Sequence, residues 1–154
     1  MQGHPQVIET LNTLLAAELT ATNQYVVHQA MATNWGYARY AQSVMARAKV
    51  EMRHADALID RVLFLNGAPR VQDLNVVTIG ESVDVQLRLD AASETDAISQ
   101  YRAAIRLCLE VADDGTRMLL ESILKDEEQH LNDIEAQQAQ IQQMGLQQFL
   151  SEQT

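Results

Sequence analysis

A chain of 154 residues, 47% of them apolar, is long enough to bury a core, and we expect one domain over residues 1–154. The net charge of −10 argues against nucleic acid as a partner, because phosphate binding needs clustered Lys and Arg. No apolar run reaches the roughly 18 residues of a membrane span, and the N-terminus shows no secretory pattern. A lone cysteine, Cys108, agrees with a reducing cytoplasm.

Four long stretches of the chain carry apolar residues at helical spacing, and the scarce Gly and Pro residues mark their ends. Pro5 suits the first turn of a helix, Asn34-Trp-Gly36 interrupts the pattern, and Ser82 is expected to act as an N-cap. The predicted helices cover about 5–34, 37–65, 83–112 and, after a turn at 113–115, the residues to about 143, with a short amphipathic fifth helix over 146–150.

The segment 66–81 is too long for a tight turn between two helices. Fully extended it reaches about 50 Å, whereas a helix of about 27 residues is about 40 Å long. The segment can therefore run the length of the bundle and let the second and third helices lie parallel. The sequence predicts an all-α four-helix bundle with a long crossover between the second and third helices and a short fifth C-terminal helix.

One pattern, a glutamate followed 33 residues later by Glu-x-x-His, occurs twice, and its two copies are offset by 76 residues. Residues equidistant from the turn of a helical hairpin lie side by side, and the midpoint of each pair falls within about one helical turn of a predicted turn. Positions three apart share a helix face. The alternative, solvated Glu/His contacts on helix surfaces, leaves the matched spacing to chance. The six residues are Glu18, Glu51, His54, Glu94, Glu127 and His130.

These six side chains form the ligand set already known from ferritin-like di-iron and di-manganese carboxylate bundles. Four carboxylates and two imidazoles suit iron or manganese better than structural zinc, which favours Cys and His. The carboxylates balance the charge of two divalent ions, and without metal their proximity raises some carboxyl pKa values. We expect Glu51 and Glu127 to bridge two metal ions and the other four residues to be terminal ligands. Iron is the expected metal, since a redox-active pair can pass two electrons to O2 or peroxide.

Two tyrosines occupy equivalent places in the two copies of the pattern. Tyr25 follows Glu18 by seven residues, or about two helical turns, and Tyr101 follows Glu94 by the same interval. One of them, with Tyr25 as our candidate, could hydrogen-bond near the metals and donate electrons. The competing interpretation is that both are core aromatic residues whose hydroxyl groups find a partner.

Met52 is expected to face away from the centre of the bundle. Its position is rotated by roughly 130° from the inward side of its helix, at about 100° per residue. An outward Met normally covers a subunit contact. The sharper hypothesis is that Met52 from two chains ligates one haem iron across a two-fold axis.

Short segments throughout the chain match one known family. Together with the six ligand positions they make the chain resemble bacterioferritin over essentially its whole length. The matching segments are Leu11-Asn12, Glu18-Leu19, Asn23-Gln24-Tyr25, Asn34-Trp-Gly36, Glu51-Met-Arg-His-Ala-Asp56, Ile79-Gly-Glu81, Asp126-Glu-Glu-Gln-His130 and Met144-Gly-Leu146.

The resemblance implies a hollow cage of 24 identical subunits. Such a cage oxidises Fe(II) with O2 or H2O2 at a di-iron ferroxidase centre and stores and detoxifies the iron as a ferric mineral. The resemblance also implies haem b between subunit pairs, held by two copies of Met52. A small iron–sulfur protein, bacterioferritin-associated ferredoxin, is the implied partner for iron release.

The sequence departs from the family pattern at two places. The family often carries His and Asp at the positions of Ala46 and Val50, where they form an iron site on the inner surface. Near Met52, positions expected to be apolar hold Thr22 and Lys49, which bears on haem binding.

Three alternatives to a homogeneous ferroxidase cage remain open from the sequence. The chain could be one of two subunit types in a mixed cage. It could be a discrete di-iron oxidase or peroxidase of the rubrerythrin type, although it lacks the Cys-x-x-Cys pairs of a rubredoxin module. It could also be a structural or haem-carrying subunit, against which the complete ligand set argues.

Overall fold

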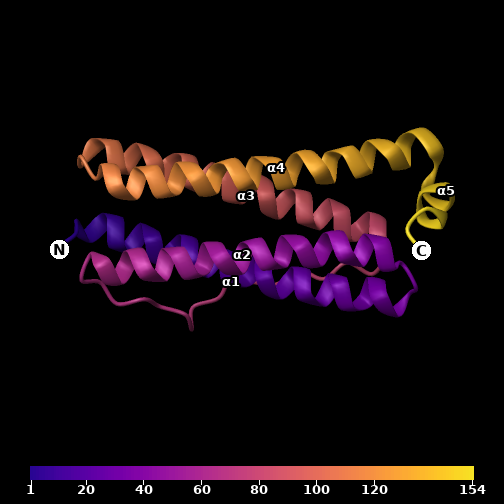
Figure 1. Cartoon of the computed structure of the whole chain (residues 1–154), viewed down its shortest axis with the longest axis horizontal. Coiled ribbons are helices and arrows are strands. Elements are labelled where there is room, and N and C mark those ends of the chain that lie inside the picture. Colours follow the sequence, from indigo (N-terminus) through magenta and orange to yellow (C-terminus); the bar gives the residue numbers. More distant parts are fainter.

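A computed structural model describes all 154 residues and contains helices without any strand. Four long helices lie side by side along the longest axis of the molecule, and the short α5 turns back across one end (Figure 1). The all-α four-helix bundle predicted from the sequence is therefore confirmed. None of the helices combines the length and apolar character that crossing a membrane requires. The helices are α1 (Pro5–Asn34), α2 (Ala38–Phe64), α3 (Val83–Glu110), α4 (Asp114–Met144) and α5 (Leu146–Ser151).

Local chemistry at the helix ends explains where the structure differs from the predicted boundaries. Helix α3 ends at Glu110, not at Ala112, because Ala112 adopts the left-handed conformation with φ 56°. Asp113 then caps α4 by accepting a hydrogen bond from the amide of Thr116 at 3.0 Å. Ser82 lies at the N-cap position of α3, but its hydroxyl donates to Asp84 at 2.7 Å and does not accept from the helix. Ser82 therefore occupies the predicted N-cap position, but without a side-chain capping hydrogen bond.

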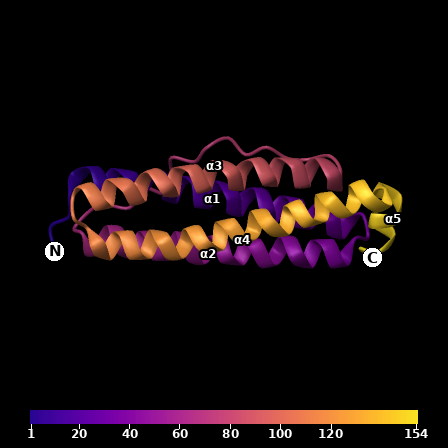
Figure 2. The ribbon, with the colours of Figure 1, turned by 90° about the horizontal axis from the view of Figure 1, so that it is seen from above.

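The crossover between α2 and α3 follows α1 over most of its length. The side-chain amide of Asn12 donates to the Ala68 carbonyl at 3.1 Å, near the start of the crossover. Further along, the amide of Asn75 donates to the Thr20 hydroxyl at 2.9 Å. Near its end, the amide of Gly80 donates to Nε2 of His28 at 2.9 Å. Because this segment returns the chain to the other end, α2 and α3 run parallel, as Figures 1 and 2 show.

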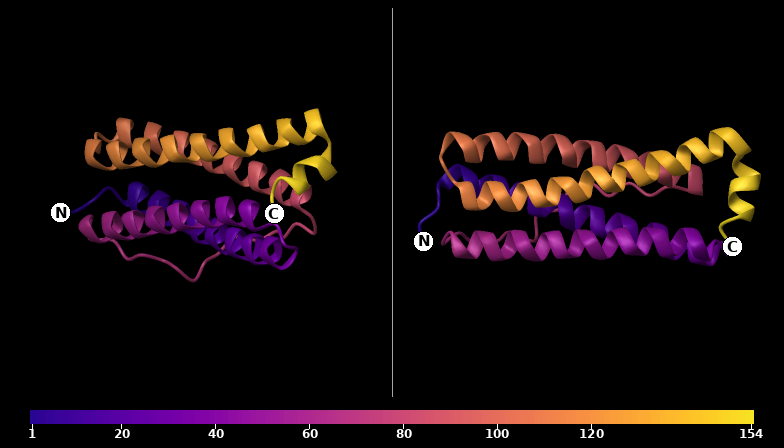
Figure 3. Two further views of the ribbon diagram at one scale, coloured as in Figure 1. Left: turned by 45° about the vertical axis from the view of Figure 1, so that its right-hand side comes forward. Right: turned by 45° about the horizontal axis from the view of Figure 1, so that its top comes forward.

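The bundle consists of two hairpins, α1–α2 and α3–α4, packed as two layers (Figure 3). Two groups of buried apolar residues fill the space between the helices. One includes Leu11, Leu58 and Ile123 and surrounds Tyr101, and the other includes Val44 and Leu87 and surrounds Tyr25. Four buried glutamates and two buried histidines lie between these two apolar regions, namely Glu18, Glu51, His54, Glu94, Glu127 and His130.

Candidate metal centre

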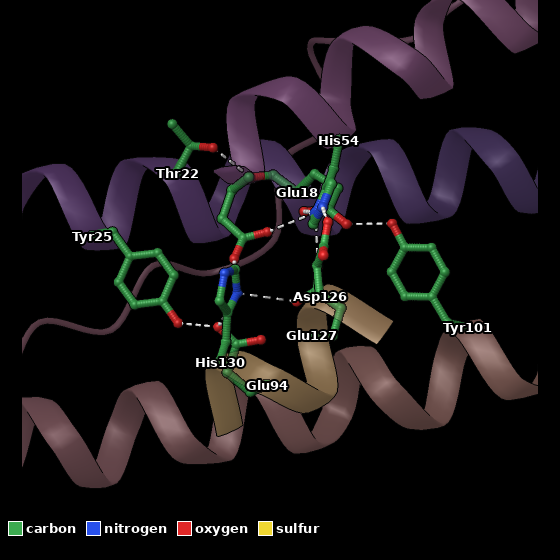
Figure 4. Close-up of polar contacts among 10 residues, drawn as sticks. Glu18, Thr22, Tyr25, His54, Glu94, Tyr101, Asp126, Glu127 and His130 are labelled. Carbon is green, nitrogen blue, oxygen red and sulfur yellow. Dashed lines mark hydrogen bonds and ion pairs between the residues drawn. The ribbon is translucent and has the colours of Figure 1, made fainter. Parts of the chain in front are cut away.

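The six residues singled out by the repeated pattern meet at the centre of the bundle (Figure 4). Each of the four long helices contributes one glutamate, and α2 and α4 each add a histidine one turn further along. All six are buried, with between 1% and 8% of their surface exposed. They form two groups of potential ligands, Glu18, Glu51, His54 and Glu127 on one side and Glu51, Glu94, Glu127 and His130 on the other.

Two glutamates belong to both groups. Within each group the ligand atoms lie within 4.8 Å of one another, and Glu51 and Glu127 supply atoms to both. This sharing places Glu51 and Glu127 where bridging ligands would lie. The remaining four residues each belong to one group, as expected of terminal ligands.

Each histidine directs its Nδ1 atom at glutamates on other helices. Nδ1 of His54 lies 2.8 Å from Glu127 Oε1 and 3.6 Å from Glu18 Oε2. Nδ1 of His130 lies 2.9 Å from Glu51 Oε1 and 3.5 Å from Glu94 Oε1. Every helix of the bundle is thus connected to another through the polar centre.

The side chains fit a pair of bound cations better than they fit one another. Four buried atoms of the centre, Glu51 Oε1, Glu94 Oε2, Glu127 Oε1 and His130 Nδ1, have no hydrogen bond. Glu51 Oε1 and His130 Nδ1 are close in distance, yet the hydrogen-bond geometry between them is unsuitable. Buried polar atoms without partners are costly, and metal ions between them would satisfy all four.

Burial in the centre and contacts within it shift the pKa values of three glutamates, Glu18, Glu51 and Glu127. Burial raises the pKa of Glu18 to about 8 and that of Glu127 to about 11. Burial also opposes ionisation of Glu51, but contacts with His130 and His54 outweigh it and hold the pKa of Glu51 below its usual value. The metal-free centre therefore retains protons at neutral pH, and divalent ions must displace them on binding.

The glutamates of the centre also change the pKa values of the two histidines. Burial alone would lower the pKa of His130, but its contacts with Glu51 and Glu94 raise the pKa to about 9. The pKa of His54 is raised as well, since its contact with Glu127 outweighs burial. Both imidazoles hold protons in place of cations when the centre is metal-free.

The two tyrosines contact the centre in a crosswise manner. The hydroxyl of Tyr25 on α1 donates to Glu94 on α3, and the hydroxyl of Tyr101 on α3 donates to Glu18 on α1. Figure 4 shows them on opposite sides of the glutamates and histidines. Burial and the adjacent carboxylates raise the pKa of both phenols well above the ordinary value. Each tyrosine is a core aromatic whose hydroxyl is satisfied by a candidate ligand.

The sequence interpretation assigned no role to Asp126, which contacts the centre directly. Its Oδ2 lies 3.0 Å from Nε2 of His54, the ring nitrogen that faces away from the glutamates. The residue precedes Glu127 in the chain, and the equivalent residue before Glu51 is Val50. Since the repeated pattern does not include this carboxylate, the repeat alone could not reveal it.

A second unpredicted feature is a buried polar cluster beside Tyr25. Asp90 Oδ1 lies 2.9 Å from Nδ1 of His28 and accepts a hydrogen bond from the Gln24 side chain at 2.8 Å. The guanidinium carbon of Arg47 lies 5.4 Å from the centre of the Tyr25 ring. His28 and Asp90 are completely buried. His28 follows the buried Tyr25 by three residues and Asp90 precedes the buried Glu94 by four, so helical spacing could have indicated that both face inward.

Two pockets reach the centre from opposite sides of the bundle. A small pocket of about 150 Å³ between α1 and α3 is lined by all four candidate glutamates and by Asn75 of the crossover. A larger pocket of about 580 Å³ between α2 and α4 is lined by His130, Ala46, Val50 and Arg47 among others. Small solutes can therefore approach the glutamates from one side and His130 from the other.

Met52 lies on the outer side of α2 and is 43% exposed. Thr22 is buried, and its hydroxyl donates to the carbonyl of Glu18 at 2.8 Å, so it needs no further polar partner. Lys49 is exposed on the same helix as Met52. The outward position of Met52 agrees with the sequence interpretation, and its thioether is free to contact another chain.

Comparisons with known proteins agree with this arrangement. The ferritin-like domain family matches residues 8–144. Bacterioferritin of Rhodobacter capsulatus is 41% identical over 149 residues, covering 97% of this chain and 92% of that protein. The bacterioferritins of Mycolicibacterium paratuberculosis and Mycobacterium leprae are 40% and 39% identical, with at least 94% of this chain and 91% of each relative covered.

The chain belongs to the bacterioferritin family. Membership supports iron storage as its general function and a multimeric cage as its form. The two groups of carboxylates and histidines, which could hold metal ions, agree with that function.

Proposed function

We propose that the protein oxidises Fe(II) at the six-residue centre and stores the product as a ferric mineral inside a 24-subunit cage. One observation carries the proposal: two groups of buried ligands share Glu51 and Glu127. A shared pair of carboxylates holds two iron ions next to each other. Two adjacent Fe(II) ions, each losing one electron, together supply the electron pair that reduces O2 or H2O2.

The residues of the chain have several distinct tasks in this reaction. The four glutamates offset the four positive charges of two Fe(II) ions, which makes burial of the ions tolerable. Glu51 and Glu127 fix the spacing between the ions, and the terminal residues Glu18, His54, Glu94 and His130 complete the two groups. The protons displaced from Glu18 and Glu127 leave through the adjacent pockets as iron enters.

Ligand variants test the site. We expect Glu18→Ala and His130→Ala each to abolish rapid Fe(II) oxidation while leaving assembly intact, measured by ferric absorbance and by size-exclusion chromatography. Glu128→Ala is the matched control, because Glu128 is adjacent to Glu127 but exposed and paired with Arg102 at 2.8 Å. Wild-type oxidation rates in the two ligand variants would overturn the assignment.

We also propose that Tyr25 donates one electron to the oxidant, O2 or H2O2, in addition to those that Fe(II) supplies. Loss of an electron from a phenol releases its proton, and Glu94 is positioned to accept the proton from Tyr25. Since Tyr101 has the same relation to Glu18, the Tyr101→Phe variant is the appropriate control. We expect Tyr25→Phe to lose a tyrosyl radical signal in electron paramagnetic resonance that Tyr101→Phe retains. Retention of the signal in Tyr25→Phe would exclude the role.

Haem b is proposed to lie between two subunits, where Met52 of each chain would hold its iron. The exposed thioether on the outer side of α2 supports this proposal. We expect Met52→Leu to abolish haem absorbance without slowing Fe(II) oxidation. Met118→Leu, which changes an exposed methionine on α4, is the matched control. Unchanged haem absorbance in Met52→Leu would contradict the ligation.

The proposed setting is the cytoplasm, which keeps a lone thiol such as that of Cys108 reduced. The cage contains this chain alone or with a second subunit type, and a bacterioferritin-associated ferredoxin supplies electrons for iron release. Co-purification of the expressed cage with its native partners distinguishes one chain type from two. A discrete di-iron oxidase without storage is the second candidate, because the six candidate ligands come together within one chain and need no cage to meet.

A further inference from the structure

The two histidines of the centre differ in what holds the ring nitrogen that faces away from the glutamates. Nε2 of His54 lies 3.0 Å from Oδ2 of Asp126, while Nδ1 of His54 faces the carboxylate of Glu127 at 2.8 Å. Nδ1 of His130 faces Glu51 in the same way at 2.9 Å. Nε2 of His130 has no hydrogen bond, and every ion pair of His130 is made through Nδ1 to a candidate ligand.

The internal repeat shows where a matching support for His130 would lie. Asp126 precedes Glu127, and the residue 76 positions earlier, before Glu51, is Val50. Val50 and His130 line the same pocket between α2 and α4. A valine side chain cannot accept a hydrogen bond, so the second half of the symmetric arrangement lacks its acceptor.

A hydrogen bond at Nε2 controls how a histidine presents Nδ1. In neutral imidazole one nitrogen carries the proton and the other a lone pair. An acceptor at Nε2 keeps the proton there, directs the lone pair of Nδ1 at a metal ion and holds the ring in place. Loss of such a supporting partner typically weakens metal affinity roughly 10- to 100-fold.

We propose that Asp126 is a positioning residue for His54 and that the centre therefore has two metal subsites of unequal affinity. The tighter subsite contains Glu18 and His54, and the weaker contains Glu94 and His130. The inference rests on the proposed di-metal function. Because the side chain of Asp126 is 52% exposed, water competes for its hydrogen bond, and we expect a difference near 10-fold, at the low end of the usual range.

Anaerobic titration of the metal-free protein with Co(II), followed by visible absorption, measures the two subsites without oxidation. We expect about two Co(II) ions per chain to bind in two separate steps. His54→Ala should remove the tighter step, and His130→Ala should remove the weaker one. The step that each variant loses identifies the subsite that fills first.

Substitutions of Asp126 and of its equivalent Val50 then show whether Asp126 positions His54 or has only a general structural role. Asp126→Val should weaken only the tighter step, and Asp126→Asn should restore part of the affinity, because an amide oxygen still accepts the hydrogen bond. Val50→Asp should strengthen only the weaker step. Asp133→Val is the matched control, since Asp133 lines the same pocket but is bonded to Gln129 at 2.8 Å and not to a histidine.

The outcomes separate the inference from the proposed function. Two equal steps in the wild-type protein, or equal weakening in Asp126→Val and Asp133→Val, would overturn the inference and leave the di-metal function intact. Failure of the wild-type protein to bind about two Co(II) ions per chain would overturn the proposed function itself. If Asp126→Val does not fold, Val50→Asp provides the same test through the other subsite, where an unchanged weaker step counts against the inference.

Discussion

The two sides of the metal centre occupy equivalent positions in the repeated sequence but differ in polarity. Around Tyr101 the core is apolar, with Leu14, Ala104 and Ile123 among its members. The residues that correspond to these three by the 76-residue offset are polar and buried beside Tyr25, namely Asp90, His28 and Arg47. The repeat therefore preserves the ligands and the two tyrosines, while the surroundings of each tyrosine are free to differ.

This difference separates two physical roles. The apolar side stabilises the fold through burial of hydrocarbon. The polar side fixes the crossover, because His28 accepts a hydrogen bond from Gly80 and is itself held by Asp90. Such a network contributes specificity more than stability, since each buried polar group must first lose its hydration.

The largest loss of unfolding free energy is expected when the buried polar cluster beside Tyr25 loses Asp90. In Asp90→Leu, His28 and Gln24 lose their shared partner while remaining buried. Removal of one member of a buried pair costs about 3–5 kcal/mol of unfolding free energy. Denaturant unfolding at fixed protein concentration measures this change. Asp96→Leu on the exposed surface of α3 is the control and should shift stability by less than about 0.5 kcal/mol. Wild-type stability in Asp90→Leu would show that the network contributes nothing.

A comparable but more local effect is expected on the apolar side. Leu58 is fully buried, and Leu58→Ala leaves a cavity that costs about 2–5 kcal/mol. Leu63→Ala on the same helix removes an equal number of atoms from a side chain that is 54% exposed, and should cost little. Co(II) affinity should stay unchanged in both variants. A large loss of affinity in Leu58→Ala would mean that the apolar core also positions the ligands.

The smallest change in unfolding free energy is expected when either tyrosine loses its hydroxyl group. Tyr101→Phe leaves Oε1 of Glu18 without its donor on the side of the centre where the core around Tyr101 is apolar, which should cost about 1–3 kcal/mol in the metal-free protein. Tyr25→Phe should cost only about 0.5–1.5 kcal/mol, because Tyr25 lies beside a polar cluster that includes Arg47. Denaturant unfolding measures both losses of unfolding free energy. Equal losses in the two variants would show that the polarity around each tyrosine does not affect the contribution of its hydroxyl group.

The fold and the ligand set were predictable because both depend on spacing along the chain. The 33-residue interval and the Glu-x-x-His pairs place the same six residues on facing helices, and the structure brings those residues together. The length of segment 66–81 similarly predicted the crossover, which hydrogen-bonds to α1 at Asn12, Thr20 and His28.

Contacts that depend on packing between helices could not be predicted in this way. Asp126 reaches His54 from another helix, and its equivalent in the repeat is a valine, so the pattern concealed it. Asp90 and His28 are 62 residues apart, and neither residue type recurs at the 76-residue offset, so the repeat did not pair them. The end of α3 at Glu110 depends on the left-handed conformation of Ala112, which composition does not disclose.

The amount of iron that the metal-free protein retains in soluble form, as Fe(II) is added in air, tests the central claim most directly. We expect uptake far beyond about two iron atoms per chain, with the six-residue centre as the catalyst through which iron enters the store. In Glu18→Ala, uptake should slow while the wild-type cage fills. Saturation at about two iron atoms per chain would contradict storage and leave a discrete di-iron oxidase.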